Sequence, residues 1–273
     1  MIEKLKGDNR PGNSWPPKQI AGHINNHTHM EHICMETIYS YIYAQINRGG
    51  YGHVTSGCVD LRPYLARRHK RCTKKGFRKV RKIEGLEALP SIDNRPKVVK
   101  EKVEIGHFEG DTMVSRKSGS RLKTMNDLVS GVVFISKTID GTAKNCNQAM
   151  IDRLIEIPPE YRKTITQDRG KENYEYETVY IALGIDMYFA HPYCSYERGA
   201  NENTDGLIRR YFPKGTDFDK ITTKEILEIK YQLNTRPRKR LNYLSPYQAY
   251  QKITGIDLPV IIKRRLVALD FRM

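Results

Sequence analysis

The second half of the chain carries short runs of apolar and β-branched residues that alternate with segments of helical spacing. Runs bounded by turn-forming residues predict strands over 108–114, 123–128, 132–138, 164–167 and 186–190. Apolar residues at helical spacing predict helices over 142–157, 174–183, 202–212, 223–233 and 245–253. Three strands come first, and helices then alternate with two more strands. This order predicts an α/β fold with a mixed five-stranded sheet flanked by helices.

The first part of the chain predicts two short helices joined by a polar connector. The first spans 15–24 and the second 34–46, where Cys34 stands at the N-cap position. Such a pair is typical of a small helical helix-turn-helix module, which presents its second helix to a DNA groove. Thr37 and Tyr41 on that second helix are therefore candidate DNA contacts. A plain helical hairpin explains the pattern equally well.

Histidines and one cysteine crowd the region of the connector: His23, His27, His29, His32 and Cys34. A tetrahedral zinc site normally has paired ligands at regular spacing, often Cys-x-x-Cys, and the sequence lacks that spacing here. Solvent-exposed histidines are the favoured interpretation, and a zinc site is the alternative.

The charge of the chain indicates a polyanionic partner. Its 273 residues include 47 Lys and Arg against 31 Asp and Glu, a formal net charge of +16. Contacts from these cations to phosphate release counterions, so the excess favours binding to nucleic acid. The sequence has no apolar run of about 18 residues and begins with a polar segment, which predicts neither a membrane span nor a signal peptide. Five widely spaced cysteines fit reduced thiols in the cytoplasm.

Positive charge is densest between residues 62 and 82. Like charges repel one another and resist compaction, which predicts a solvated linker lying along DNA phosphates without sequence choice. The candidate phosphate contacts within it are Arg67, Arg68, Lys70, Arg71, Lys74 and Lys75.

The expected organisation of the chain follows from these changes in composition. A flexible arm (1–13) precedes the helix-turn-helix module (14–60), and a basic linker (61–97) leads to the α/β core (98–254) and a C-terminal tail (255–273).

Three acidic residues stand out in the core. Asp111 lies on the first predicted strand, Asp168 closes the fourth, and Glu202 falls in the first turn of the helix that Asn201 is expected to cap. An acid in a first helical turn also has an ordinary explanation, because carboxylates favour helix N-termini.

These acids belong to longer motifs: Phe108-Glu109-Gly110-Asp111, Asp168-Arg169-Gly170-Lys171-Glu172, Arg198-Gly199-Ala200-Asn201-Glu202-Asn203-Thr204 and Tyr211-Phe212-Pro213-Lys214-Gly215-Thr216-Asp217. Thirty-three residues separate Asp168 from Glu202. In these features, over roughly residues 12 to 253, the chain resembles bacterial insertion-sequence transposases of the insertion-sequence-thirty family. The resemblance implies a retroviral-integrase-like, ribonuclease-H-like core with an Asp-Asp-Glu triad. It also implies an N-terminally short chain, because the family has a further helix-turn-helix region ahead of this one.

The resemblance implies DNA cleavage and strand transfer that depend on two magnesium or manganese ions. In that chemistry Asp111 bridges both ions, while Asp168 and Glu202 are outer ligands. Water attack at the element end frees a 3′-hydroxyl, which then attacks target DNA without a covalent enzyme intermediate. The implied partners are the inverted-repeat ends of the element and target DNA, bound by a homodimer or larger homo-oligomer in the bacterial cytoplasm or nucleoid.

Further polar residues near the triad have two interpretations each. Lys171, Arg198, Asn201 and Lys214 are candidate phosphate contacts or ordinary solvated residues. Glu109 shares a strand face with Asp111 and either supports the site or pairs with a nearby lysine. Asn126 and Asp127 are also unusual, since both are polar within a predicted central strand, and the sequence does not indicate how that part of the strand packs.

Three other functions remain as alternatives. The chain could be a DNA-binding regulator whose core is only a scaffold, although a scaffold has no need of three converging acids. It could be a catalytically impaired transposase remnant, or a ribonuclease-H-like nuclease without strand transfer. Magnesium-dependent nicking and joining of element-end DNA distinguish these classes.

Overall fold

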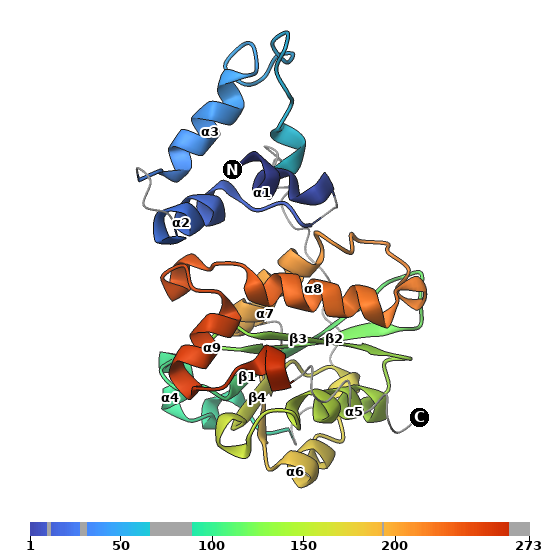
Figure 1. Ribbon diagram of the computed structural model, residues 1–273. Coiled ribbons are helices and arrows are strands. Elements are labelled where there is room, and N and C mark those ends of the chain that lie inside the picture. The colour runs from blue at the N-terminus through green and yellow to red at the C-terminus, as the bar shows by residue number, and fades with distance from the viewer. Residues whose placement is uncertain (10–11, 28–31, 66–88, 193, 262–273) are drawn as a thin grey trace. The chain divides into compact units, whose positions relative to one another are not determined.

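The computed structural model describes residues 1–9, 12–27, 32–65, 89–192 and 194–261. The chain divides into two compact units, which are considered separately. One comprises Met1–Lys82 with Arg236–Leu244, and the other comprises Ile83–Thr235 with Ser245–Met273. The larger unit holds the sheet, and the smaller unit holds the N-terminal helices (Figure 1).

The larger unit is built on the predicted five-stranded mixed sheet. Its strands are β1 (His107–Met113), β2 (Arg121–Asp127), β3 (Val133–Thr138), β4 (Thr164–Gln167) and β5 (Asp186–Phe189). They lie in the order β3-β2-β1-β4-β5. Strands β1, β2 and β3 pair antiparallel, whereas β4 pairs parallel with both β1 and β5. This topology confirms the fold class expected of a ribonuclease-H-like core.

Helices cover both faces of the sheet (Figure 1). They are α4 (Lys97–Glu101), α5 (Ala143–Leu154), α6 (Glu177–Leu183), α7 (Gly199–Ile208), α8 (Thr223–Thr235) and α9 (Pro246–Thr254). Three short 3-10 turns matter for the site: η4 (Ile92–Asn94), η6 (Lys171–Asn173) and η7 (Ser195–Arg198). Among the helices of the described ranges, none is long and apolar enough to cross a membrane.

Local capping explains where several helices begin and end. The Thr142 side chain accepts a hydrogen bond from the Asn145 backbone N–H at the start of α5. Ser245 and Gln248 form a reciprocal capping box at the start of α9, with Pro246 in the first turn. Helix α9 ends at Gly255, whose φ of 75° is the left-handed conformation that glycine adopts without strain.

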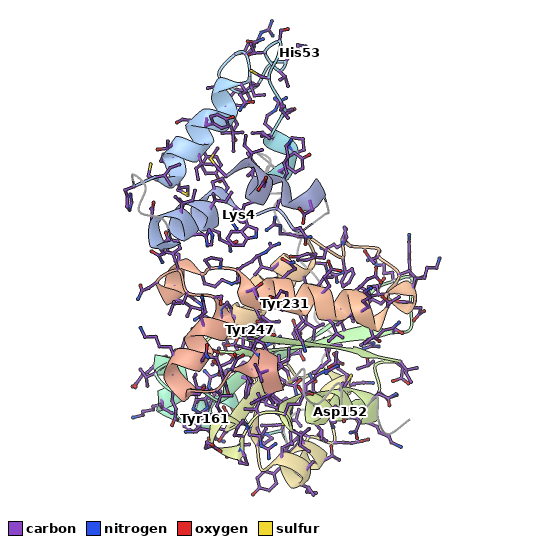
Figure 2. The ribbon with its side chains drawn as sticks, viewed as in Figure 1. Lys4, His53, Asp152, Tyr161, Tyr231 and Tyr247 are labelled. Atoms are coloured by element: carbon purple, nitrogen blue, oxygen red, sulfur yellow. The ribbon has the colours of Figure 1, made fainter. Side chains whose placement is uncertain are left out.

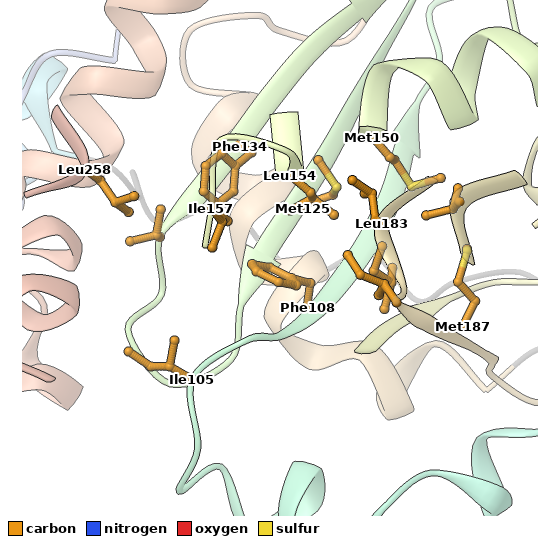
Figure 3. Close-up of a cluster of buried hydrophobic side chains, with 14 of the residues drawn as sticks. Ile105, Phe108, Met125, Phe134, Met150, Leu154, Ile157, Leu183, Met187 and Leu258 are labelled. Atoms are coloured by element: carbon orange, nitrogen blue, oxygen red, sulfur yellow. The ribbon is translucent and has the colours of Figure 1, made fainter. Parts of the chain in front are cut away.

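Two apolar clusters pack on opposite faces of the sheet. Phe108, Met125 and Phe134 belong to the cluster shown in Figure 3, together with Met150 of α5. Val133 and Ile135, which flank Phe134 in β3, belong to the second cluster with residues of α7 and α8. Successive side chains of a strand point to opposite faces, so β3 is apolar on both faces over its first three residues, 133–135.

Asp127 is buried at the end of β2 because it organises the turn to β3. Its Oδ1 accepts hydrogen bonds from the backbone N–H and the hydroxyl of Ser130, at 2.7 and 2.6 Å. Its Oδ2 accepts from the backbone N–H of Gly106 at 2.9 Å. Burial raises the pKa of Asp127, and these donors oppose that effect. A polar residue in this strand is therefore a turn-forming residue with satisfied hydrogen bonds.

The smaller unit contains both predicted N-terminal helices, α2 (Pro17–His27) and α3 (Met35–Ala44). The Sγ of Cys34 accepts from the Thr37 backbone N–H at 3.4 Å, so Cys34 does cap α3. Thr37 and Tyr41 are both exposed on this helix.

The expectation of a flexible arm over 1–13 is wrong for the described part of that segment. Residues Ile2–Lys6 form helix α1, and Leu5 on it is fully buried among the residues of α2 and α3. Lys4 lies over the Trp15 ring, 4.5 Å from its centroid (Figure 2). One helical turn with a single inward leucine is too short to produce a hydrophobic pattern in the sequence.

Residues Arg236–Leu244, placed in the core by the expected boundaries, belong to the smaller unit. The Nη2 of Arg236 donates to the Gly12 carbonyl at 2.8 Å, and the Asn26 side chain donates to the Asn242 carbonyl at 3.3 Å. Contacts between residues more than 200 positions apart leave no trace in local sequence patterns. The six candidate contacts of the basic linker, Arg67, Arg68, Lys70, Arg71, Lys74 and Lys75, lie outside the described residues, as does His29.

Lys230 of α8 provides a test of the packing in the larger unit. It is 3% exposed, and its Nζ has no hydrogen-bond partner among the described residues. Burial, followed by the nearby charge of Arg153, lowers its pKa from 10.5 to about 8. The unfolded chain therefore binds more protons between pH 8 and 10.5, so stability rises with pH across that window. Lys230→Met should raise the free energy of unfolding by roughly 1–3 kcal/mol at pH 7.

This gain should be smaller at pH 9.5 than at pH 7 when both proteins are unfolded in urea. Lys224→Met, an exposed position on the same helix, is the matched control and should show little gain and no trend with pH. A gain for Lys230→Met that stays constant with pH would contradict the burial of a charged lysine.

Candidate active site

Asp111 and Asp168 come together because β1 and β4 are parallel neighbours. The register pairs Glu109 with Thr166, and two residues farther along each strand direction stand Asp111 and Asp168. Side chains two apart share a strand face, so both carboxylates emerge on the same side of the sheet. Their side chains are 23% and 40% exposed, which leaves both reachable from solvent.

One guanidinium contacts both carboxylates. The Nη1 of Arg198 lies 3.4 Å from Asp111 Oδ1, and its Nη2 lies 3.4 Å from Asp168 Oδ2. The same Nη1 donates to the Gly110 carbonyl at 3.1 Å. Arg198 is only 9% exposed, so its main contacts are with the site and not with solvent.

A buried hydrogen-bond relay orients Asp168. The Nδ2 of Asn173 donates to Asp168 Oδ1 at 2.7 Å and to the Asp168 carbonyl at 3.2 Å. The Oδ1 of Asn173 accepts from Lys123 Nζ at 2.7 Å, and Lys123 also donates to Thr112 and Gln167. Lys123 is fully buried, and burial lowers its pKa. Sequence reasoning missed both Lys123 and Asn173, and the only signal was a lysine inside a predicted central strand.

Helix α7 is fixed to the sheet through amide side chains. The Asn201 amide donates to the Gly110 carbonyl at 2.8 Å and accepts from Asn126 at 2.8 Å. The side-chain Oδ1 of Asn126 in turn accepts from the Thr204 hydroxyl at 2.9 Å. This relay accounts for the polar Asn126 in a central strand, since it anchors the helix that carries Glu202.

Asn201 is not the N-cap of this helix and is not available to a phosphate. Helix α7 begins at Gly199, three residues earlier than expected, and Asn201 is 1% exposed with its amide engaged. The first turn of α7 is instead capped from strand β1, where Glu109 Oε2 accepts from the Ala200 backbone N–H at 3.1 Å. Glu109 is buried, and burial raises its pKa. Two roles were expected for Glu109, support of the site or pairing with a nearby lysine, and this contact favours support of the site.

Glu202 is exposed in the first turn of α7. Residues three and four apart are neighbours on a helix surface, so Glu202 lies next to Asp205 and follows Arg198 by four positions. Asp205 was not anticipated, yet its carboxylate interacts with the charge of Asp111, and its Oδ1 is buried without a hydrogen-bond partner among the described residues. Burial, and then the charge of Asp111, raise the pKa of Asp205 to about 7.

The donor set suits a hard divalent cation, although it does not form a complete cage. Asp111 and Asp168 offer carboxylate oxygens within reach of one guanidinium, that of Arg198, and both remain partly exposed. Within the described ranges, no three His, Cys, Asp or Glu side chains are grouped closely enough to hold a metal ion. The structure thus brings Asp111 and Asp168 of the expected triad to the guanidinium of Arg198 and leaves Glu202 on the adjoining helix.

Comparison with known proteins gives the context of this geometry. No protein-family model matches the chain. The transposase for insertion sequence element IS4351 of Bacteroides fragilis is 38% identical over 243 residues, covering 87% of this chain and 69% of that protein. The chain belongs to the insertion-sequence-thirty (IS30) family of transposases. The family and the general function that the motifs predicted are thereby confirmed.

Transposase InsI for element IS30A of Escherichia coli strain K12 is 33% identical over 256 residues, which cover 92% of this chain and 63% of that protein. The chain thus spans about two thirds of the length of these relatives. Among solved structures, the HTLV-2 integrase catalytic core domain in complex with magnesium shows 16% identity and a TM-score of 0.42, covering 55% of this chain and 99% of that one.

In this IS30-family chain, a basic pocket of about 590 Å³ opens beside the start of α7. It is lined by η4, α4 and η7. Its four basic residues, Arg95, Lys97, Lys100 and Lys102, outnumber its three acids, Asp93, Glu109 and Glu197. Tyr196 on its wall is 77% exposed. These residues belong to none of the sequence motifs, so their proximity to the site appears only after folding. The expected contacts Lys171 and Lys214 are both exposed.

The amide relay predicts a stability cost at Asn126. Asn126→Ala should lower the free energy of unfolding by about 1–3 kcal/mol, because buried groups of Asn201 and Thr204 lose their partner. Urea unfolding followed by circular dichroism measures the change. Asn203→Ala, an exposed position on α7, should stay within roughly 0.5 kcal/mol of the parent protein. Equal costs for the two variants would show that the relay does not anchor the helix.

Proposed function

We propose that this chain cleaves DNA at the ends of an insertion sequence and joins the freed 3′ ends to target DNA. The observation that carries the proposal is that Asp111 and Asp168, at the ends of neighbouring parallel strands, both contact one positive group, the guanidinium of Arg198. Carboxylates held this close repel each other unless a positive charge lies between them. The arrangement therefore suits a bound cation.

The proposed ligands are Asp111, Asp168 and Glu202, and the proposed ions are two magnesium or manganese ions. When bound, such ions neutralise charge at the scissile phosphate and lower the pKa of the attacking water or hydroxyl. The chain itself positions the ligands. Asn173 fixes the Asp168 carboxylate, and Glu109 with Asn201 holds the helix on which Glu202 stands.

The proposed DNA surface surrounds these carboxylates. Lys171 follows Asp168 in the chain, Lys214 follows α7, and the basic pocket adds Lys97 and Lys100. Thr37 and Tyr41 on α3 remain the proposed base or phosphate contacts of the helix-turn-helix module, joined to the core by the basic linker. Handling two element ends at once favours at least a homodimer, acting on DNA in the bacterial cytoplasm.

The triad can be tested directly with element-end DNA and magnesium. Asp111→Asn, Asp168→Asn and Glu202→Gln should each lower strand nicking by roughly 100-fold or more, because each removes a proposed ion ligand. DNA binding should change far less, since these residues contribute no positive charge. Nicking on labelled duplexes and binding by fluorescence anisotropy measure the two effects.

Asp186→Asn, an exposed acid at the start of β5, should keep full nicking activity. Full activity in any triad variant would remove that residue from the site. A parent protein that binds element ends but never nicks them with magnesium would favour the regulator or the impaired remnant.

Phosphate contacts predict a steep salt dependence of DNA binding. Each phosphate neutralised by Lys or Arg contributes about −0.9 to the slope of log affinity against log salt concentration. Lys100→Gln in the basic pocket should make the slope shallower by about 1, whereas Lys144→Gln, exposed at the start of α5, should leave it unchanged. Equal slopes for both variants would exclude the pocket from the DNA surface.

A further inference from the structure

We infer that Arg198 is a built-in cation that occupies the space between Asp111 and Asp168 and competes with divalent ions for the two carboxylates. This inference rests on the proposed function, because it assumes that these aspartates are ion ligands. It assigns Arg198 a role different from the phosphate contact that the sequence suggested. Arg198 is thus a positioning residue that sets how tightly the core binds its ions.

The contact distances indicate that the ion pairs between Arg198 and the two aspartates can be opened. Strong hydrogen bonds between a guanidinium and a carboxylate are about 2.7–2.9 Å long. Both contacts of Arg198 are 3.4 Å, so the guanidinium is shared between the carboxylates without binding either tightly. Its Nε is buried and has no hydrogen-bond partner within the described parts of the chain. Few bonds therefore hold the guanidinium in place.

Removing the guanidinium leaves the backbone beneath it satisfied. The Gly110 carbonyl accepts from Arg198 at 3.1 Å and also from the Asn201 amide at 2.8 Å. When Arg198 withdraws, the Asn201 bond remains, so no buried carbonyl is left without a donor. Helix α7 also stays capped, because its cap is the Glu109 carboxylate.

A divalent ion has the electrostatic advantage at this place. It carries twice the charge of a guanidinium and approaches carboxylate oxygens to about 2.0–2.6 Å. Asp111 and Asp168 are partly exposed, so an ion can reach them from solvent. Without an ion, the single charge of Arg198 limits the repulsion between the carboxylates of Asp111 and Asp168.

Competition predicts that removal of Arg198 strengthens ion binding. Manganese binding to the full chain without DNA can be measured from the electron paramagnetic resonance signal of free manganese at pH 7.5. Arg198→Gln should lower the dissociation constant by about three- to tenfold, because one like charge leaves the site. Arg198→Lys keeps the charge but loses the planar fork that reaches both carboxylates, so its dissociation constant should be intermediate.

Arg116→Gln is the matched control, since Arg116 is exposed on the connection between β1 and β2. It should bind manganese as the parent protein does, because solvent and salt screen distant exposed charges. Circular dichroism of each variant checks that it is folded. In the presence of a chelator, Arg198→Gln should also melt at a lower temperature than the parent, and manganese should restore more of its stability.

The outcomes separate this inference from the proposed function. Unchanged or weaker manganese binding by Arg198→Gln, with binding abolished in Asp111→Asn and Asp168→Asn, would overturn the role of Arg198 and keep the ion site. If instead Asp111→Asn and Asp168→Asn bind manganese as the parent does, the ion site itself is wrong and the inference falls with it.

Discussion

The anchoring of α7 against β1 is the interaction on which the site depends. The Gly110 carbonyl holds the Asn201 amide, and Asn201 is held in turn by Asn126, which also binds Thr204. Because α7 carries Arg198 at its start and Glu202 and Asp205 in its first turns, this relay determines which charged groups face Asp111. A helix displaced by one turn would present different side chains to the strand.

Electrostatics explains why the site combines acids with a buried arginine. The chain has a large positive excess, yet the fold gathers Asp111, Asp168 and Asp205 in one place at the sheet ends. Such a group is stable only if a cation or a proton offsets the repulsion. Arg198 supplies the cation, while burial and then the charge of Asp111 raise the pKa of Asp205.

Polar residues inside the strands of this core have specific structural tasks. Lys123 supports the relay to Asp168, Asp127 shapes a turn, and Glu109 caps α7. Each is buried and hydrogen-bonded, as burial of polar groups requires. In sequence they interrupt the apolar pattern, and in the structure they connect the sheet to the elements that form the site.

Local chemistry in the sequence determined the strands, most helices and the family. The run 164–167 predicted β4 to the residue, Ser245 and Pro246 marked the start of α9, and the motifs around Asp111, Asp168 and Glu202 identified the IS30 family. Hydrophobic period, capping and motif spacing all act over a few residues, so they can be read without a fold. Only tertiary structure decided that Glu109 caps α7, that Asp205 contacts Asp111, and that Arg198 joins the two aspartates. These contacts join residues 30 or more positions apart through strand pairing and helix packing, which is why no local pattern contains them.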